Sequence, residues 1–383
     1  MLLCMKKDMS ASKRDQAISE VSAGIDWKLF YRQVNKHRVF PVVYKNMRTF
    51  CSGQIENSVM TFLKNKSNQN IGHSLKLSSE LVRIVGILNE QEIPVLTLKG
   101  PLLSLALYGD MNIRVSNDLD LMINLSDLQR TDRLLIEAGY RRVRPSEILT
   151  GKQRDIFLKN NHHYAYSNDL NVHIELHWKF DFIGFNTAFS KTWEDRRTLL
   201  VNRTQFNLMS AEEEFLYYVF HGAKHGWNRL RWLSDVAEMI GSNNYNWDII
   251  IKRAGQLKML HMLAQAMVLC RDLMDTAVPG VLSHVVDDNL RGRKLAFMAI
   301  PIILDTIESH QGRNLKKYSF FLMKGFSPKM KYVMMHFDPL QEDIQSVKVS
   351  DKVFFVYYLV RPFNWFKRRF LKKHISQKKV DGV

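Results

Sequence analysis

The chain has 383 residues, 46% of them hydrophobic and 11% aromatic, and it carries a formal net charge of +17. This length and composition allow a large core with two or three subdomains and exclude a disordered chain. No apolar run reaches the ~18 residues that cross a bilayer, so we expect no transmembrane segment. Three widely spaced cysteines exclude a disulfide framework and a CxxC metal site, which is typical of a reducing cytoplasm.

The basic excess indicates either a polyanionic partner or a generally basic, solvated surface. Nucleotides, nucleic acids and anionic lipid are the partners that such a charge favours.

Helical spacing dominates the first third of the chain. Residues 1–22 are polar and mixed in charge, and we expect them to form a frayed arm. Residues 25–47 predict two short helices that break near Pro41, and residues 55–89 predict one or two longer helices. The sequence therefore predicts an N-terminal helical cap over residues 1–70.

A compact unit of strand, turn, helix, loop and strand follows over residues 94–124. Strands are expected at 94–98 and 118–123, with a helix at 102–108 between them. Asp118 and Asp120 lie two residues apart on the second strand, so they share one face of it. Because paired carboxylates are costly to bury without a cation, and Mg²⁺ prefers carboxylate oxygens, we expect a magnesium site here.

A later strand offers a third carboxylate. After a helix at 126–138, a short strand at 140–143 and a helix at 148–160, residues 162–166 and 170–178 predict a hairpin with its turn near Asn168. Glu175 lies on one face of its second strand between two histidines, His173 and His177, for which packing and a supporting or base-stacking role remain alternatives. Three carboxylates on neighbouring strands would suit two metal ions ~3.5–4 Å apart. The alternative is that Asp118 caps the loop and Glu175 lies on an exposed face.

The rest of the chain predicts irregular structure over 184–207 and then helices to the end. We expect a core domain over 71–208 and a C-terminal helical domain over 209–383. Residues 361–379 combine aromatic and basic side chains without an acidic residue. This tail suits an interfacial helix on anionic lipid or a polyanion such as tRNA, or it is a terminal helix that docks its aromatic side chains on the core.

Several runs resemble one known family in the right order. They are LKGPLLSLALYGDMNIRVSNDLDLMI, VHIELHWKF, EEEFLYYVFHGAKHGWNRLRWLSDVAEMI and, more loosely, IDWKLFYRQVNKHRVFPVVYKNM. The family is the uncharacterised bacterial nucleotidyltransferase-like family of the polymerase-beta-type nucleotidyltransferase superfamily. The resemblance implies an α+β fold, with a polymerase-beta-like core and a small mixed sheet between N-terminal helices and a larger C-terminal helical region. It also implies that Asp118, Asp120 and Glu175 are the catalytic, metal-binding carboxylates.

The turn before the first helix of this core departs from the superfamily pattern. The superfamily usually has Gly-Ser or Gly-Gly at the phosphate-side turn, whereas this chain has Gly100 followed by Pro101, which offers no backbone N–H. Lys99 or Ser104 would compensate as a phosphate ligand. Arg114, in the loop before the carboxylates, is a further candidate for the phosphate oxygens.

A histidine pair lies on the helix predicted after residue 210. His221 and His225 share a helix face, with Lys224 between them and Arg229 and Asp235 beyond. Lys224 and His225 are candidates for phosphate or substrate contact. The alternatives are packing between subdomains and a zinc site, although the run HGAKH lacks the glutamate of HExxH.

The expected function is transfer of NMP from an NTP to a hydroxyl or phosphate acceptor with Mg²⁺, or with Mn²⁺ in its place. The resemblance implies a glycan or lipid-linked acceptor more than tRNA, in polysaccharide or glycolipid assembly. We expect a cytoplasmic protein with peripheral contact at the inner membrane surface through its tail. The alternatives are a toxin-like enzyme acting on tRNA or protein, and a catalytically silent nucleotide-binding module. The Gly100–Pro101 turn favours such a module, and the three intact carboxylates argue against it.

Overall fold

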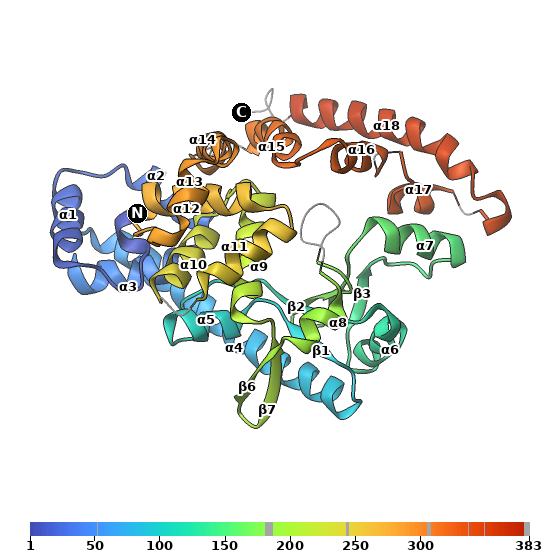
Figure 1. The fold of residues 1–383 in the computed structure, drawn as a ribbon, viewed down its shortest axis with the longest axis horizontal. Helices are drawn as coiled ribbons and strands as arrows, with labels where there is room; N and C mark the ends of the chain where they lie inside the picture. Colours follow the sequence, from blue (N-terminus) through green and yellow to red (C-terminus); the bar gives the residue numbers. More distant parts are fainter. Residues whose placement is uncertain are drawn as a thin grey trace.

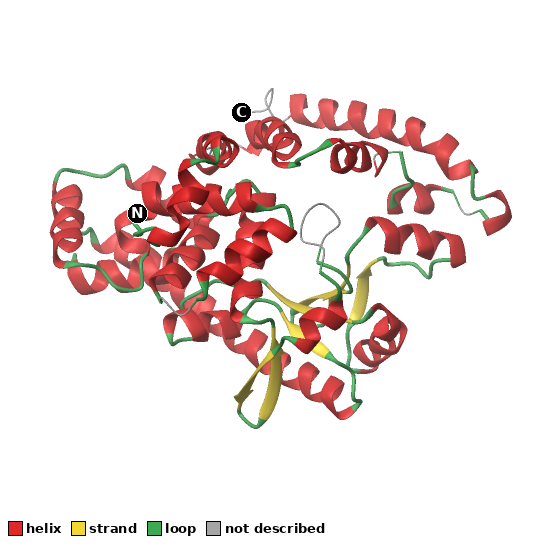
Figure 2. Cartoon of the chain, in the orientation of Figure 1, coloured by secondary structure: helices red, strands yellow, loops and turns green. Residues whose placement is uncertain are grey.

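The computed structural model describes residues 1–51, 53–180, 187–242, 245–304, 308–335, 337–347 and 349–378. Helices surround one mixed sheet (Figures 1 and 2), so the predicted α+β class is confirmed. In Figure 1 the sheet lies in the lower half of the molecule, and the C-terminal helices form the upper edge of the molecule.

The sheet has seven strands in the order β3-β4-β5-β2-β1-β7-β6. β2 pairs parallel with β5 and antiparallel with β1, so it lies near the centre of the sheet. In the register of the β2–β5 pair, Asp120 lies opposite Glu175. The strands are β1 Val95–Thr97, β2 Asp118–Ile123, β3 Arg141–Arg144, β4 His163–Ser167, β5 His173–His177, β6 Arg197–Val201 and β7 Thr204–Leu208.

The predicted strand over 118–123 and the predicted hairpin of β4 and β5 are confirmed. The prediction of irregular structure over 184–207 is wrong for its described part, which contains helix α8 (Phe189–Glu194) and the β6–β7 hairpin. The hairpin turns at Asn202 and Arg203, both at positive φ (49° and 66°). Such turns usually carry glycine, so the Asn-Arg pair gave no clear turn signal. Residues 184–186 of this prediction lie outside the described residues.

The expectation of a frayed N-terminal arm is also wrong. Residues 2–22 form the short helix η1 (Leu2–Met5) and helix α1 (Ala11–Ser22). The Met5 side chain is fully buried, and the Asn46 side-chain amide donates to the carbonyls of Cys4 and Lys6 at 3.0 and 2.8 Å. These tertiary contacts order a segment whose composition is that of a loose arm.

Five helices complete the N-terminal region and the covering of the sheet. Helices α2 (Trp27–His37) and α3 (Phe40–Phe50) are the predicted pair, and α4 (Asn57–Glu90) is one helix that continues through residue 70. Helix α5 (Pro101–Tyr108) follows Gly100. Helix α6 (Leu128–Glu137) and the C-terminal half of α4 pack on the sheet in one hydrophobic cluster.

The C-terminal helices share their core with the N-terminal helices. One hydrophobic cluster runs from Met5, Phe30 and Val34 to the helices that follow the sheet. Besides α8, the α-helices after residue 144 are α7 Gly151–Asn160, α9 Ala211–Lys224, α10 Leu230–Gly241, α11 Trp247–Gln256, α12 Leu260–Met274, α13 Ser283–Asp287, α14 Leu290–Leu304, α15 Glu308–Leu322, α16 Phe326–Met335, α17 Gln341–Ser346 and α18 Val356–Lys378. The Leu230 backbone N–H at the start of α10 donates to His37 Nδ1 at the end of α2 at 3.1 Å, which places the end of α2 beside the pocket described below.

The predicted tail forms helix α18, except for its last residue, Lys379, which lies outside the described residues. Arg361 is buried and donates to Asp343 Oδ2 at 3.1 Å, so it ties α18 to α17. Phe363 and Phe366 are exposed. Within the described residues, no helix combines the length and the apolar character needed to span a bilayer.

Candidate functional site

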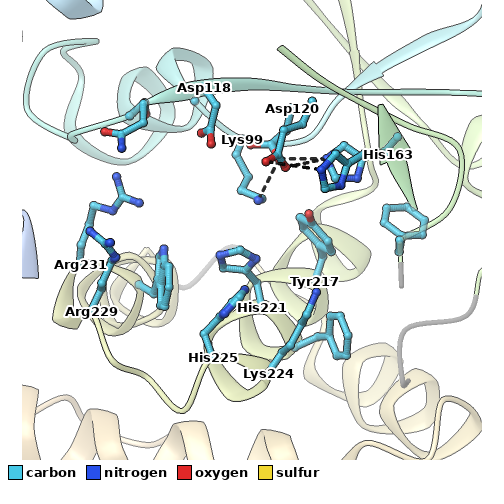
Figure 3. Close-up of a pocket in the computed structure, with 18 of the residues that line it drawn as sticks. Lys99, Asp118, Asp120, His163, Tyr217, His221, Lys224, His225, Arg229 and Arg231 are labelled. Carbon is cyan, nitrogen blue, oxygen red and sulfur yellow. Dashed lines mark hydrogen bonds and ion pairs between the residues drawn. The ribbon is translucent and has the colours of Figure 1, made fainter. Parts of the chain in front are cut away.

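A cavity of about 460 Å³ lies between the sheet and the α9–α10 helix pair. Its sheet side carries Asp118 and Asp120 from β2 and Glu175 and His177 from β5. Its opposite side carries histidine, lysine and arginine side chains from α9, α10 and the segment between them (Figure 3). The pocket is therefore acidic on one wall and mostly basic on the other.

Alternation along β2 produces the acidic wall. Leu119, Leu121 and Ile123 are buried in the hydrophobic cluster beneath the sheet. Because successive side chains of a strand point to opposite faces, Asp118 and Asp120 face the pocket instead. The parallel register then brings Glu175 beside Asp120.

Asp120 lies at the centre of a chain of polar contacts. Its Oδ1 accepts a hydrogen bond from Lys99 Nζ at 3.1 Å, and the same oxygen lies 3.1 Å from His177 Nε2. His177 Nε2 also lies 3.4 Å from Glu175 Oε2, and His163 Nε2 lies 3.8 Å from Glu175 Oε1. From the sequence, packing and a supporting role were both open for His177. The structure places its ring directly between two of the carboxylates.

The charges of this group are unevenly stabilised. Burial and the neighbouring charge of Asp120 raise the pKa of Asp118. Burial also opposes ionisation of Asp120, but Lys99 and His177 outweigh it and hold the pKa of Asp120 well below its ordinary value. Burial opposes the charge on Lys99 as well, and Asp120 outweighs it and raises the pKa of Lys99. Asp120 and Lys99 thus form a charged pair.

The donor set of this wall fits a divalent cation. Ligand atoms of Asp120, Glu175 and His177 lie within 4.8 Å of one another, and among the described residues a second such group is His162, His163 and His177. Asp118 lines the same cavity but is not part of either group. Carboxylate oxygens suit Mg²⁺ and Mn²⁺, and an imidazole nitrogen adds preference for a transition metal such as Mn²⁺.

Helix α9 carries the basic wall opposite. The Ser210 side chain caps its start by accepting from the Glu213 backbone N–H. Lys224 and His225 at the other end of the helix line the pocket. The His221 and His225 rings lie 4.9 Å apart, and both pack against Trp232 at 4.8 and 5.2 Å. The groups of described residues that could hold a metal do not include this histidine pair.

Arg114 lines the pocket and forms a buried ion pair with Asp235. Its Nε donates to Asp235 Oδ2 at 2.9 Å, and its Nη1 donates to Ser116 Oγ at 3.1 Å. Ser104, in contrast, is not among the described residues that line the pocket. Its hydroxyl is fully buried, donates to the Asp110 carbonyl at 2.6 Å and accepts from the Arg114 backbone N–H at 3.1 Å. Ser104 therefore holds the loop that positions Arg114.

The turn at Gly100 lies at the edge of the pocket, directly after β1. Gly100 has a φ of 93°, a conformation that L side chains rarely adopt, so glycine is required here for its backbone. Pro101 then occupies the first position of α5, where a missing N–H costs nothing.

Of the site residues expected from the sequence, eight line this one pocket and Ser104 does not. The eight are Asp118, Asp120, Glu175, Lys99, Gly100, Arg114, Lys224 and His225. Sequence reasoning did not select Arg38, Tyr217 or Arg231, which also line it. Tyr217 lies one helical turn before His221, so its position on the pocket face of α9 follows from helical spacing. No local pattern singles out Arg38 or Arg231.

Comparison with known proteins gives one family. The model of a family described as "uncharacterised nucleotidyltransferase" matches residues 23–275. No curated protein matches the chain. A solved structure, an antigenic nucleotidyltransferase-like protein from Paracoccidioides brasiliensis, is 15% identical with a TM-score of 0.32, over 54% of this chain and 96% of that chain. That likeness is too low to support a conclusion. The family match covers every residue of the pocket, and the chain belongs to this uncharacterised nucleotidyltransferase family.

Proposed function

We propose that the pocket is the active site of a divalent-metal-dependent nucleotidyltransferase, which transfers NMP from an NTP to a hydroxyl or phosphate acceptor. The observation that carries the proposal is the pairing of the acidic wall with the basic wall in one cavity of about 460 Å³. A triphosphate and its metal require this combination of charges.

Asp120, Glu175 and His177, with Asp118 beside them, would hold Mg²⁺ or Mn²⁺. When bound, the ion neutralises charge on the triphosphate and activates the attacking oxygen. Lys99 and Lys224 lie on the same pocket and supply positive charge for phosphate oxygens. Gly100 allows the backbone to turn beside these groups, although Pro101 gives no N–H to a phosphate.

The acceptor that we favour is a glycan or a lipid-linked compound at a membrane surface. Phe363 is 71% exposed and Phe366 is 54% exposed on α18, and Lys367 beside them is also exposed. Exposed aromatic and basic side chains on one terminal helix suit the surface of an anionic membrane. Transfer to tRNA or to a protein, and nucleotide binding without turnover, are the alternatives that the assay below separates.

The test uses the full chain, each of the four α-labelled NTPs and Mg²⁺, with lipid, glycan, tRNA or protein fractions as acceptors. We expect transfer of label with release of pyrophosphate, and loss of both in Asp120→Asn. Asp169→Asn makes the same change at a side chain that is 95% exposed at the β4–β5 turn, so it should leave the activity unchanged. Tight NTP binding without pyrophosphate in every fraction would instead identify a binding module. Label in tRNA or protein would reject the glycan or lipid assignment.

A further inference from the structure

A second basic group lies at the Asp118 end of the acidic wall. Arg38, Arg229 and Arg231 line this part of the pocket. Figure 3 shows Arg229 and Arg231 on the Asp118 side, whereas Lys224 lies toward Asp120 and Lys99 bonds to Asp120. Arg38 comes from the end of α2, where its left-handed backbone (φ 54°) ends the helix, and the other two come from the start of α10.

This arginine cluster, comprising Arg38, Arg229 and Arg231, is poorly compensated by the protein. The Nε and Nη1 atoms of Arg231 are buried and have no hydrogen-bond partner among the described residues. Burial, with the nearby charges of Arg114 and Arg38, lowers the pKa of Arg231 to about 9. Burial and Arg229 lower the pKa of Arg38 to about 10. Buried donors without partners cost free energy, so the cluster is built for an anion that the protein does not itself supply.

The position of the cluster assigns the anion. In nucleotidyl transfer, the acceptor oxygen forms a bond to the α-phosphorus while the bond from that phosphorus to pyrophosphate breaks. The attacking and leaving oxygens lie roughly in line on opposite sides of the phosphorus. The two basic groups flank the acidic wall in the same way, so one serves the pyrophosphate and the other serves the acceptor. Lys99 and Gly100, at the turn after β1, mark the triphosphate side.

We infer that the arginine cluster binds a phosphate group of the acceptor, so the acceptor is a phosphorylated compound, either a soluble sugar phosphate or a lipid-linked phosphate. This inference rests on the proposed function. Arginine suits the role because its planar guanidinium donates to two phosphate oxygens at once. Where the phosphate is the nucleophile, no proton has to move. Where a neighbouring hydroxyl attacks, its proton passes to water.

The experiment measures two affinities on the full chain with Mg²⁺. The first is the affinity for each of four non-hydrolysable α,β-methylene NTP analogues. The second is the affinity for inorganic phosphate, for glucose 1-phosphate and for dodecyl phosphate, titrated calorimetrically after the analogue has saturated its site. We expect phosphate to bind the nucleotide-loaded protein, and Arg38→Ala and Arg231→Gln to weaken it by about tenfold or more. Their nucleotide affinities should change by less than about threefold, within the spread of a lost long-range charge. The better of the two organic phosphates then identifies the soluble or the lipid source.

Arg133→Ala serves as the matched control, because it removes one exposed arginine from α6, outside the pocket. It should leave both affinities unchanged. Melting curves without ligand should show that Arg231→Gln is folded and at least as stable as the parent chain, since the substitution removes a buried charge that Asp235 compensates only in part.

Three results would overturn the inference. The nucleotide analogue could exclude phosphate, Arg231→Gln could weaken nucleotide and phosphate equally, or phosphate could bind the arginine variants as well as the parent chain. The first two would assign the arginines to the triphosphate. Absence of Mg²⁺-dependent binding of all four analogues would refute the proposed function itself, and the nucleotide titration alone reveals it.

Discussion

The buried ion pair between Arg114 and Asp235 offers the sharpest test of how this site is held together. Arg114 lies in the loop that leads into β2, and Asp235 lies on α10, so the pair joins the acidic wall to the basic wall. The two side chains are 3% and 0% exposed, and Arg114 Nε lies 2.9 Å from Asp235 Oδ2. Burial opposes the charge of Arg114, but Asp235 outweighs it and raises the pKa of Arg114.

Removing either partner leaves a buried charge, which typically costs about 3–5 kcal/mol of stability. The two losses should differ in this protein. Asp235 also stabilises the charge of Arg231, so Asp235→Leu leaves two guanidinium groups without their carboxylate. Arg114→Met leaves Asp235 beside Arg231, which partly compensates it. We therefore expect Asp235→Leu at or above the top of that range and Arg114→Met toward its lower end.

Denaturant unfolding of the parent chain, both single variants and the double variant measures these losses. The double variant should lose less than the sum of the single losses, because neither partner is left alone. Two outcomes would contradict this prediction: single losses that add in the double variant, and a larger loss for Arg114→Met than for Asp235→Leu. The first outcome would show that the two charges are not coupled. The second would show that Arg231 does not share the carboxylate.

Two further predictions concern parts of the fold that support the pocket. Gly222→Ala should destabilise the protein by about 1–3 kcal/mol in a thermal melt, since the added Cβ would lie 2.2 Å from the fully buried Trp227 ring; Gly255→Ala, where the added atom meets open space, is the control. Glu80 accepts hydrogen bonds from three side chains, and that of Arg83 is the main cause of its lowered pKa. Because the folded pKa is lowered, its stabilising effect is complete above the ordinary value of 4.5 and disappears as the pH falls through the folded pKa. Melting temperatures of the parent chain and Glu80→Gln should thus differ at pH 7 and converge in acid; a constant difference would contradict the assignment.

The acidic wall could be predicted from the sequence because local residue patterns encode it. Alternation over residues 118–123 assigns Asp118 and Asp120 to one face, and the same rule assigns Glu175 and His177 to one face of β5. The residues did not by themselves specify the parallel pairing that puts Asp120 opposite Glu175. That pairing depends on long-range contacts, which alternation within one strand does not report.

Only part of the basic wall could be predicted from the sequence. Lys224 and His225 stand out on an amphipathic helix, whereas Arg38 ends a helix in a different region of the sequence. Arg38 reaches the pocket because α2 packs in the same hydrophobic cluster as α9 and α10. Ser104 shows the converse, since a hydroxyl one turn into α5 suggests a phosphate ligand, and tertiary packing gives it to the Arg114 loop instead.

Part of the net charge of +17 is concentrated in the pocket, because its acidic and basic residues do not balance. Acidic residues of the pocket come from adjacent strands and compensate one cation well, as the Lys99–Asp120 contact at 3.1 Å shows. The arginines converge from separate helices on Asp118, whose own ionisation is opposed by burial and by Asp120. The protein therefore holds more positive charge at that end than its carboxylates neutralise. An anionic ligand would restore the balance, which makes the surplus a property of the site as well as of the surface.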